Sequence, residues 1–376
     1  MLQHIKPAKN IISLRLKNLR QEFRRLDING FIIPRTDEHQ GEYVAPSSER
    51  LAWLTGFTGS AGLSLVMEER AALFVDGRYT LQAKIEVPSG LFDYCSLSKH
   101  HQTDWISDNV KPGMNLGYDP WLMTPHQIIY YQEVCKKFRA ILKPVSRNPI
   151  DAIWTDRPAP PISPMFIHDI SFVGQSATNK RQQIADALSL EGIDAAILTA
   201  PDSIAWLLNT RGGDVPFSPL TLAFAIVHAD KSIDLFVDQA KISPEIKKYL
   251  GSDVRCHEPK ALDPALDALN KKNVRLNFET APIYLLHRLE AIGAKVQAGV
   301  DPCQLPKAIK TSVQLDGIRA AHLRDGVSLT RFLAWLEGNA TSKLVTESSA
   351  ASTLESFRLN NENYKGLSFP TISGAG

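Results

Sequence analysis

The sequence predicts an α/β protein with two similar units, each a mixed sheet flanked by helices, followed by the beginning of a third unit. Three observations support this fold class. Apolar residues alternate between the spacing of helices and the short runs of strands. The same order of segments occurs twice along the chain. A proline-rich stretch separates the two occurrences.

The first copy of the repeated order opens with an amphipathic helix. Four apolar residues lie on one face of that helix: Leu16, Leu19, Phe23 and Leu26. Short apolar strands are expected at residues 31–34 and 72–76, with a glycine-rich turn at 56–62 between them. This alternation of helix and strand is typical of α/β domains.

The second copy begins about 160 residues later, a spacing at which an internal repeat indicates a duplicated unit. Its helix contains Ile184 and Leu188, and its first strand is expected at residues 195–198. Ala-Trp-Leu occurs in both copies before a glycine turn, and Leu-Phe-Val-Asp occurs in both afterwards. Apolar strands that follow amphipathic helices look alike in any α/β protein, but the shared order favours duplication.

Proline-rich segments predict the boundaries between the units. Residues 156–164 contain four prolines, and proline fixes φ and lacks an N–H donor, so neither a helix nor a central strand continues there. Pro302 and Pro306 precede a long helix with apolar residues at helical spacing, such as Leu329 and Leu333. The expected units are residues 1–162, 163–302 and 303–376.

Composition and charge exclude several classes of protein. Lys and Arg number 42 against 40 Asp and Glu, and a net charge of +2 does not favour nucleic acid. The longest apolar stretches fall well short of the roughly 20 residues that span a bilayer, and the N-terminus lacks an apolar signal core. We therefore expect a cytoplasmic protein with neither a nucleic-acid nor a membrane partner. The cysteines lie far apart in the sequence, which favours reduced thiols over a zinc site.

Motifs of known catalytic sites are missing from the sequence. It contains no His-Glu-x-x-His, no Gly-x-Ser-x-Gly and no phosphate loop, and the glycine-rich turn at 56–62 lacks the lysine and the spacing of a nucleotide site. Two arginines next to glycines, Arg78 and Arg211, remain as candidates for binding a carboxylate or a peptide carbonyl. For each, the pattern alone favours an internal ion pair, with Asp76 and Asp214 respectively.

Seven segments together resemble the long, three-domain form of Xaa-Pro aminopeptidase, a metallopeptidase of the pita-bread group. They occur in the family's order from near the N-terminus to the last residues: Asp37-x-His39, Glu42-Tyr43-Val44-Ala45-Pro46, 56–62, Asp76-Gly77-Arg78-Tyr79, 153–158, 205–214 and 368–374. Two departures from the family pattern are Gly41, where serine is usual, and Thr58, where aspartate is common.

The resemblance implies two creatinase-type N-terminal domains and the start of a pita-bread catalytic domain. Members of the family remove the first residue from peptides with proline in second position, using a hydroxide that bridges two metal ions, usually manganese, and a homodimer is expected. The family's metal ligands lie beyond Gly376, so we expect neither a catalytic residue nor a metal ligand in this chain, and no activity from the chain alone. Arg78 matches the family's peptide-contacting arginine, which favours substrate binding for Arg78. Arg211 remains a second candidate.

Two alternatives stay open at this point. A creatinase- or prolidase-like hydrolase shares the fold, although prolidases usually lack the second creatinase-type copy. A non-catalytic binding module of the same architecture is expected to carry acidic tracts, and none occurs in this sequence.

Overall fold

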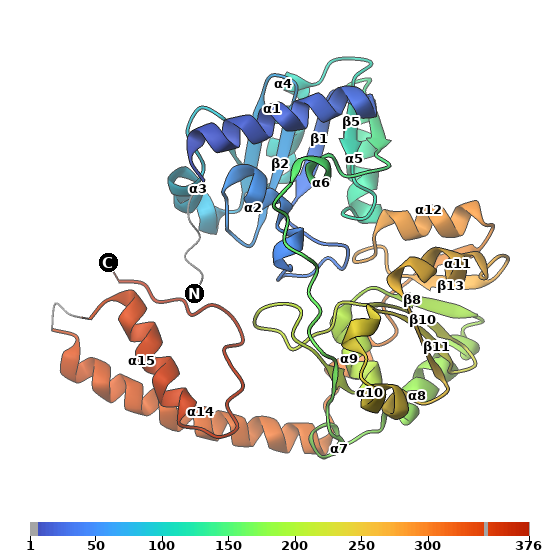
Figure 1. Cartoon of the computed structure of the whole chain (residues 1–376), viewed down its shortest axis with the longest axis vertical. Helices are drawn as coiled ribbons and strands as arrows, with labels where there is room; N and C mark the ends of the chain where they lie inside the picture. Colours follow the sequence, from blue (N-terminus) through green and yellow to red (C-terminus); the bar gives the residue numbers. More distant parts are fainter. Residues whose placement is uncertain (1–6, 342–344, 376) are drawn as a thin grey trace.

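The computed structural model describes residues 7–341 and 345–375 and contains two six-stranded mixed sheets in succession along the chain (Figure 1). In the first sheet the strand order is β4-β3-β2-β1-β5-β6. Its strands are β1 (Gly30–Pro34), β2 (Gly62–Met67), β3 (Ala71–Val75), β4 (Asp93–Ser96), β5 (Asn115–Tyr118) and β6 (Ile141–Pro144). Its helices are α1 (Lys9–Leu26), α2 (Arg50–Thr55), α3 (Thr80–Glu86), α4 (Lys99–Asn109), α5 (Pro125–Lys137) and α6 (Pro149–Ile153).

The second sheet repeats this topology, with the order β12-β11-β10-β8-β13-β14. Its strands are β8 (Ala195–Leu198), β10 (Phe224–His228), β11 (Ile233–Phe236), β12 (Val254–His257), β13 (Asn273–Leu276) and β14 (Lys295–Ala298). Its helices are α8 (Ala177–Leu190), α9 (Pro201–Leu208), α10 (Pro244–Leu250), α11 (Leu262–Asp267) and α12 (Ile283–Ala291).

Strand directions also agree between the two sheets. In each, the first strand pairs antiparallel with the second and parallel with the fifth, and the third pairs parallel with the fourth. The predicted fold class and the duplication are therefore confirmed. The unit boundaries at residues 162 and 302 stay predictions.

Both faces of each sheet are covered by helices, which explains why the central strands are apolar throughout. Side chains alternate between the faces along a strand. Phe31 and Ile33 of β1 pack with residues of α1 and α2, whereas Ile32 packs with residues of α4 and α5. In the second copy Ala196 and Leu198 belong to one apolar cluster and Ile197 to another. Burying a side chain such as Phe31 contributes roughly 1.5 to 3 kcal/mol.

The loops at the carboxyl ends of β1 and β5 contact the second copy. His39 Nδ1 lies 3.0 Å from the carbonyl oxygen of Thr199, at the carboxyl end of β8. Trp121 stacks on Tyr284 with 4.1 Å between ring centroids. The Ile283 N–H donates to the Met123 carbonyl oxygen over 2.8 Å. The two copies therefore contact each other through segments that follow the carboxyl ends of corresponding strands, β1 and β5 in the first copy and β8 and β13 in the second.

The remaining elements connect and follow the two sheets. They are β7 (Phe166–Ile167), α7 (Ile170–Val173), β9 (Thr210–Arg211), α13 (Gln304–Ala308), α14 (Ser312–Asn339), α15 (Glu347–Leu359) and the short 3₁₀ helices η1 (Pro46–Ser48), η2 (Gly77–Tyr79), η3 (Gln239–Lys241) and η4 (Pro259–Ala261). Residues 156–164 belong to no helix or strand, as their prolines predict.

The long helix predicted after Pro306 is α14, whose N-terminus carries a capping box formed by Thr311 and Gln314. Its apolar residues are largely exposed, for example Leu333 at 54%. Figure 1 shows α14 and α15 extending away from the second sheet. Among residues 7–341 and 345–375, no helix is both long and apolar enough to cross a membrane.

Candidate functional site

The turn that follows β3 carries the first predicted site residue. The Asp76 carboxylate accepts a hydrogen bond from the Arg78 backbone N–H over 2.9 Å and so caps the helix η2. A side chain at Gly77 would meet no atom within 4 Å, so this turn leaves the sheet into open space. Arg78 therefore projects from the carboxyl end of β3.

An ion pair holds the Arg78 side chain, which is 68% exposed. Its Nη2 lies 2.6 Å from Asp76 Oδ2, and its Nε lies 3.2 and 3.1 Å from the two carboxylate oxygens. Hydrogen bonding from Arg78 lowers the pKa of the Asp76 carboxyl group. The ion pair that the pattern favoured is thus present, but it occupies the Nε–Nη2 edge of the guanidinium. Within the described residues Nη1 makes no hydrogen bond, so that edge is free.

The Tyr79 ring lies beside the Arg78 guanidinium. The Arg78 Cζ lies 5.2 Å from the centroid of the Tyr79 ring, within the range of a cation–π contact. The Tyr79 hydroxyl lies 2.6 Å from Ser60 Oγ, and its ring meets the buried Phe57 ring edge to face at 5.7 Å. The sequence analysis missed Tyr79 and Ser60, although both lie in segments that carry the family resemblance.

The glycine-rich turn at 56–62 packs closely around these rings. A Cβ on Gly59 would lie 2.3 Å from Phe57 Cζ and 2.8 Å from Tyr79 Cδ1, and a Cβ on Gly62 would lie 2.8 Å from Phe57 Cε1. Side chains at these glycines would clash with the rings. Close packing thus accounts for both glycines, in agreement with the tight strand connection expected from the sequence.

Arg211 lies on β9, which pairs with β7. Its predicted partner Asp214 pairs instead with Lys241, with 2.7 Å between Lys241 Nζ and Asp214 Oδ2. The expected Arg211–Asp214 ion pair is therefore wrong. The reason is that the Asp214 side chain points inward, is 0% exposed, and also accepts hydrogen bonds from the Ser163 and Leu222 N–H groups.

Two basic side chains, His168 and Lys180, lie close enough to Arg211 for its charge to act on them. Its Nη1 donates to the Thr210 carbonyl oxygen over 3.1 Å, and burial lowers its pKa. Burial and then the charge of Arg211 lower the pKa of His168, and the same two causes lower the pKa of Lys180 to about 8. Lys180 donates to Asn209 Oδ1 over 2.6 Å. A half-buried guanidinium with no carboxylate partner in the described residues suits an anionic or strongly polar oxygen.

The structure does not bring the two predicted site residues together. Arg78 belongs to the first copy and Arg211 to the second, and no contact joins them in the described part of the chain. Nor do any three His, Cys, Asp or Glu side chains of residues 7–341 and 345–375 form a group that could hold a metal ion. The described residues thus do not fit a two-metal centre.

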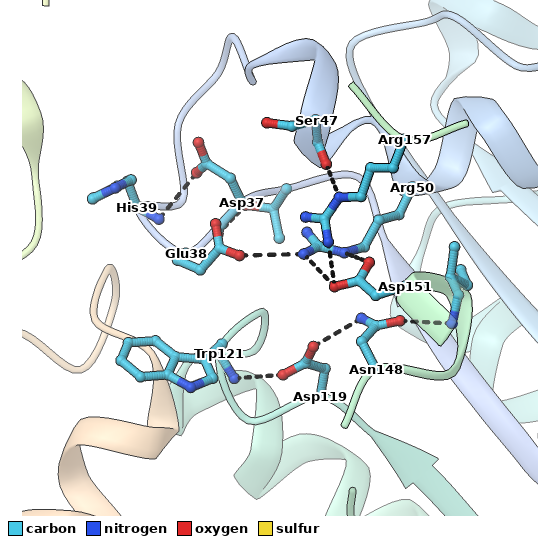
Figure 2. A network of polar contacts seen from close by, with 12 residues as sticks. Asp37, Glu38, His39, Ser47, Arg50, Asp119, Trp121, Asn148, Asp151 and Arg157 are labelled. Atoms are coloured by element: carbon cyan, nitrogen blue, oxygen red, sulfur yellow. Dashed lines mark hydrogen bonds and ion pairs between the residues drawn. The ribbon is translucent and has the colours of Figure 1, made fainter. Parts of the chain in front are cut away.

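A partly buried polar network around Arg50, at the carboxyl ends of β1 and β5, connects two of the family-like segments (Figure 2). Arg50 donates to both carboxylate oxygens of Asp151, over 2.8 and 3.0 Å, and its Nη2 lies 3.3 Å from Glu38. Arg157, in the segment 153–158, pairs with Asp151 at 2.8 Å and donates to the Ser47 carbonyl oxygen. The network fastens the start of the proline-rich linker to the loop that carries His39.

Two buried carboxylates, Asp37 and Asp119, also lie at the carboxyl ends of β1 and β5. Burial raises the pKa of Asp119, which accepts hydrogen bonds from the Trp121 N–H and the Asn148 amide. Asp37 Oδ1 accepts from the His39 and Gly41 N–H groups, whereas its buried Oδ2 has no hydrogen-bond partner in the part of the chain that the structure describes. These contacts hold His39 and Trp121 against the second copy.

Comparison with known proteins agrees with this architecture. The Creatinase/Prolidase N-terminal domain family matches residues 15–152 and, through a second family of the same description, residues 156–314. A probable Xaa-Pro aminopeptidase P of Aspergillus niger is 33% identical over 97% of this chain and 61% of its own length. Most of the chain thus consists of two Creatinase/Prolidase N-terminal domains, and almost its whole length is similar to Xaa-Pro aminopeptidases. The probable Xaa-Pro aminopeptidase P of Coccidioides posadasii is 34% identical to this chain, and the similarity covers 97% of this chain and 62% of the Coccidioides protein.

Among solved Xaa-Pro aminopeptidase structures, the X-prolyl aminopeptidase of Caenorhabditis elegans superposes with a TM-score of 0.88 at 28% identity. The superposition covers 96% of this chain and 62% of that protein, which is described as a cytosolic enzyme with a di-nuclear active site. The chain thus spans about three fifths of the length of these relatives.

Proposed function

We propose that this chain is the substrate-guiding N-terminal part of an Xaa-Pro aminopeptidase that removes the first residue from peptides with proline in second position. The observation that carries the proposal is the similarity to Xaa-Pro aminopeptidases over almost the whole chain, together with the superposition on the C. elegans enzyme. A cytoplasmic location and a homodimer belong to the proposal, and the cytosolic C. elegans enzyme supports the location.

The proposed substrate explains why binding residues outside the reaction centre matter. The bond before proline is a tertiary amide without an N–H, so an enzyme has fewer backbone hydrogen bonds with which to hold the peptide. Donors such as arginine can bind the remaining carbonyl and carboxylate oxygens. In the proposed enzyme, a hydroxide bridging two metal ions, which we take to be manganese, supplies the nucleophile.

We assign the metal ligands to residues outside this chain, because its described residues do not fit a two-metal centre. The proposed contribution of this chain is peptide binding by Arg78 and Arg211. Arg78 is supported by its exposed, partly free guanidinium, and Arg211 by its half-buried position without a carboxylate partner in the described residues. The proposed units remain residues 1–162, 163–302 and 303–376.

The test compares this chain with the full-length protein that contains it. Both are purified, loaded with Mn²⁺ and incubated with Arg-Pro-Pro, and the released arginine is quantified. We expect release by the full-length protein and none by this chain. Release by this chain alone would contradict the assignment of the metal ligands, and no release by a folded, metal-loaded full-length protein would favour a binding module.

A further inference from the structure

In the first copy, Asp76 and Tyr79 restrain the side chain of Arg78. An exposed arginine samples many rotamers, so binding a ligand through a free arginine costs conformational entropy. A guanidinium held in place before the ligand arrives avoids part of that cost. Asp76 holds one edge of the Arg78 guanidinium, and the Tyr79 ring lies beside it at 5.2 Å.

Tyr79 is itself anchored at two points. Its hydroxyl lies 2.6 Å from Ser60 Oγ, and its ring packs edge to face on Phe57, which is 1% exposed. The loop that carries Ser60 is in turn fastened to α3, because Thr58 hydrogen-bonds Glu86 through both its N–H and its hydroxyl, over 2.8 and 2.7 Å. The ring beside Arg78 therefore has a fixed position relative to β3.

The second copy shows that this arrangement is not needed to form the turn. There the Asp238 carboxylate accepts from the Ala240 N–H over 2.9 Å, as Asp76 does from Arg78. Ala240 stands at the position of Arg78, and Lys241 stands at the position of Tyr79. The capping aspartate is thus common to both copies, whereas the arginine and tyrosine occur only in the first.

We propose that Tyr79 is a positioning residue that, together with Asp76, holds Arg78 so that its free Nη1 edge meets a carbonyl or carboxylate oxygen of the peptide substrate. The inference rests on the proposed function, in which Arg78 contacts that substrate. The glycine at position 59 agrees with this role, because any side chain there would clash with Phe57 and displace the Tyr79 ring. Tyr79 touches no reacting atom and acts only through Arg78.

The experiment is a double-mutant cycle in the Mn²⁺-loaded full-length protein, with kcat and KM measured on Arg-Pro-Pro. Tyr79→Leu removes the ring, Tyr79→Phe retains it without the hydroxyl group, and Arg78→Ala removes the guanidinium. Tyr79→Leu is expected to lower kcat/KM roughly tenfold through misplacement of Arg78, whereas Tyr79→Phe should retain most of the wild-type value. In the Arg78→Ala background, Tyr79→Leu should have no further effect.

A matched control is Tyr130→Leu, which removes another exposed cation–π pair of the first copy, with Lys99 at 5.1 Å. It should leave kcat/KM unchanged. If Tyr79→Leu lowers kcat/KM equally with and without Arg78, its role is structural and the positioning proposal is overturned. If Arg78→Ala lowers kcat/KM but Tyr79→Leu does not, positioning fails and the substrate role stands. If Arg78→Ala has no effect, the substrate role itself fails, and positioning with it.

Discussion

The two creatinase-type copies have the same turn after their third strand but present different side chains from it. Asp76 and Asp238 each cap the turn through a hydrogen bond of 2.9 Å. Two residues after the capping aspartate, the first copy has Arg78 and the second has Ala240. A role in the fold explains what the copies share, and the added arginine needs another explanation. The comparison supports a binding function for the turn of the first copy.

A second pair of equivalent positions differs in burial. In each copy a cation on the first helix lies over a tryptophan ring and donates to that tryptophan's carbonyl oxygen: Arg15 over Trp53 at 4.3 Å, and Lys180 over Trp206 at 4.6 Å. Lys180 is 1% exposed, and burial lowers its pKa to about 8. The same contact therefore joins two helices in each copy. Of these two contacts, only that of Lys180 contains a cation whose pKa lies near neutral pH.

The largest expected effect concerns Lys241, which occupies the position of Tyr79 in the second copy. The Lys241–Asp214 pair is almost fully buried, with side chains 5% and 0% exposed. Lys241→Met leaves a buried carboxylate without its cation and should lower the free energy of unfolding by about 3 to 5 kcal/mol. Urea unfolding of this chain measures the change.

The control for this prediction is Asp214→Asn combined with Lys241→Met. Because the double variant buries no unpaired charge, it should recover a substantial part of the lost stability. A loss below about 1 kcal/mol in Lys241→Met, the range of exposed ion pairs, would show that position 241 is not structural and would remove the contrast with Tyr79.

The fold and its duplication could be predicted because periodicity and turn residues are local signals. Partners of buried polar groups could not, since they depend on which distant segments the fold brings together. Arg50 and Asp151 are 101 residues apart, and Asp214 pairs with Lys241 rather than with nearby Arg211. The Arg78–Asp76 pair was predictable, because the two residues are separated only by Gly77. The spacing in α14 predicted a helix correctly, but spacing does not say what covers its apolar face.

A smaller effect is expected from the titration of Lys180. Its pKa is lowered from 10.5 to about 8 in the folded protein, so between these pH values the unfolded chain binds more protons. The contribution of Lys180 to stability should therefore rise with pH in this window, by at most about 3 kcal/mol, and stay constant below it. Urea unfolding of wild type and Lys180→Met at pH 7.5, 9 and 10.5, values chosen to bracket the window, isolates the effect.

The equivalent cation of the first copy supplies the control, because Arg15 stays charged over the whole range. Arg15→Met should change stability by the same amount at each pH. A difference between wild type and Lys180→Met that does not vary with pH would contradict the assignment of Lys180 as the titrating group.

The smallest expected effect concerns the segment between β1 and α2, residues 35–49. The equivalent segment between β8 and α9 in the second copy is much shorter, residues 199–200. Asp37 Oδ2 is buried without a hydrogen-bond partner among the described residues, and a Cβ on Gly41 would lie 3.0 Å from the Tyr43 carbonyl oxygen and 3.8 Å from Asp37 Oδ2. Gly41→Ser should place a hydroxyl within reach of this oxygen, so its free energy of unfolding should exceed that of Gly41→Ala by about 1 kcal/mol. Gly41→Ala adds the same Cβ without the donor, so equal stability of the two variants would contradict this account.

The central claim is that the turn after the third strand carries a peptide-binding arginine, Arg78, in the first copy, where the second copy has Ala240. The most direct measurement is kcat/KM and melting temperature of Arg78→Ala on one preparation of the full-length protein. The account predicts a loss of about ten- to a hundredfold in kcat/KM with an unchanged melting temperature. Arg70→Ala, which breaks an exposed pair with Asp93 of 2.7 Å, should change neither. Unchanged turnover per folded molecule with a lowered melting temperature would contradict it.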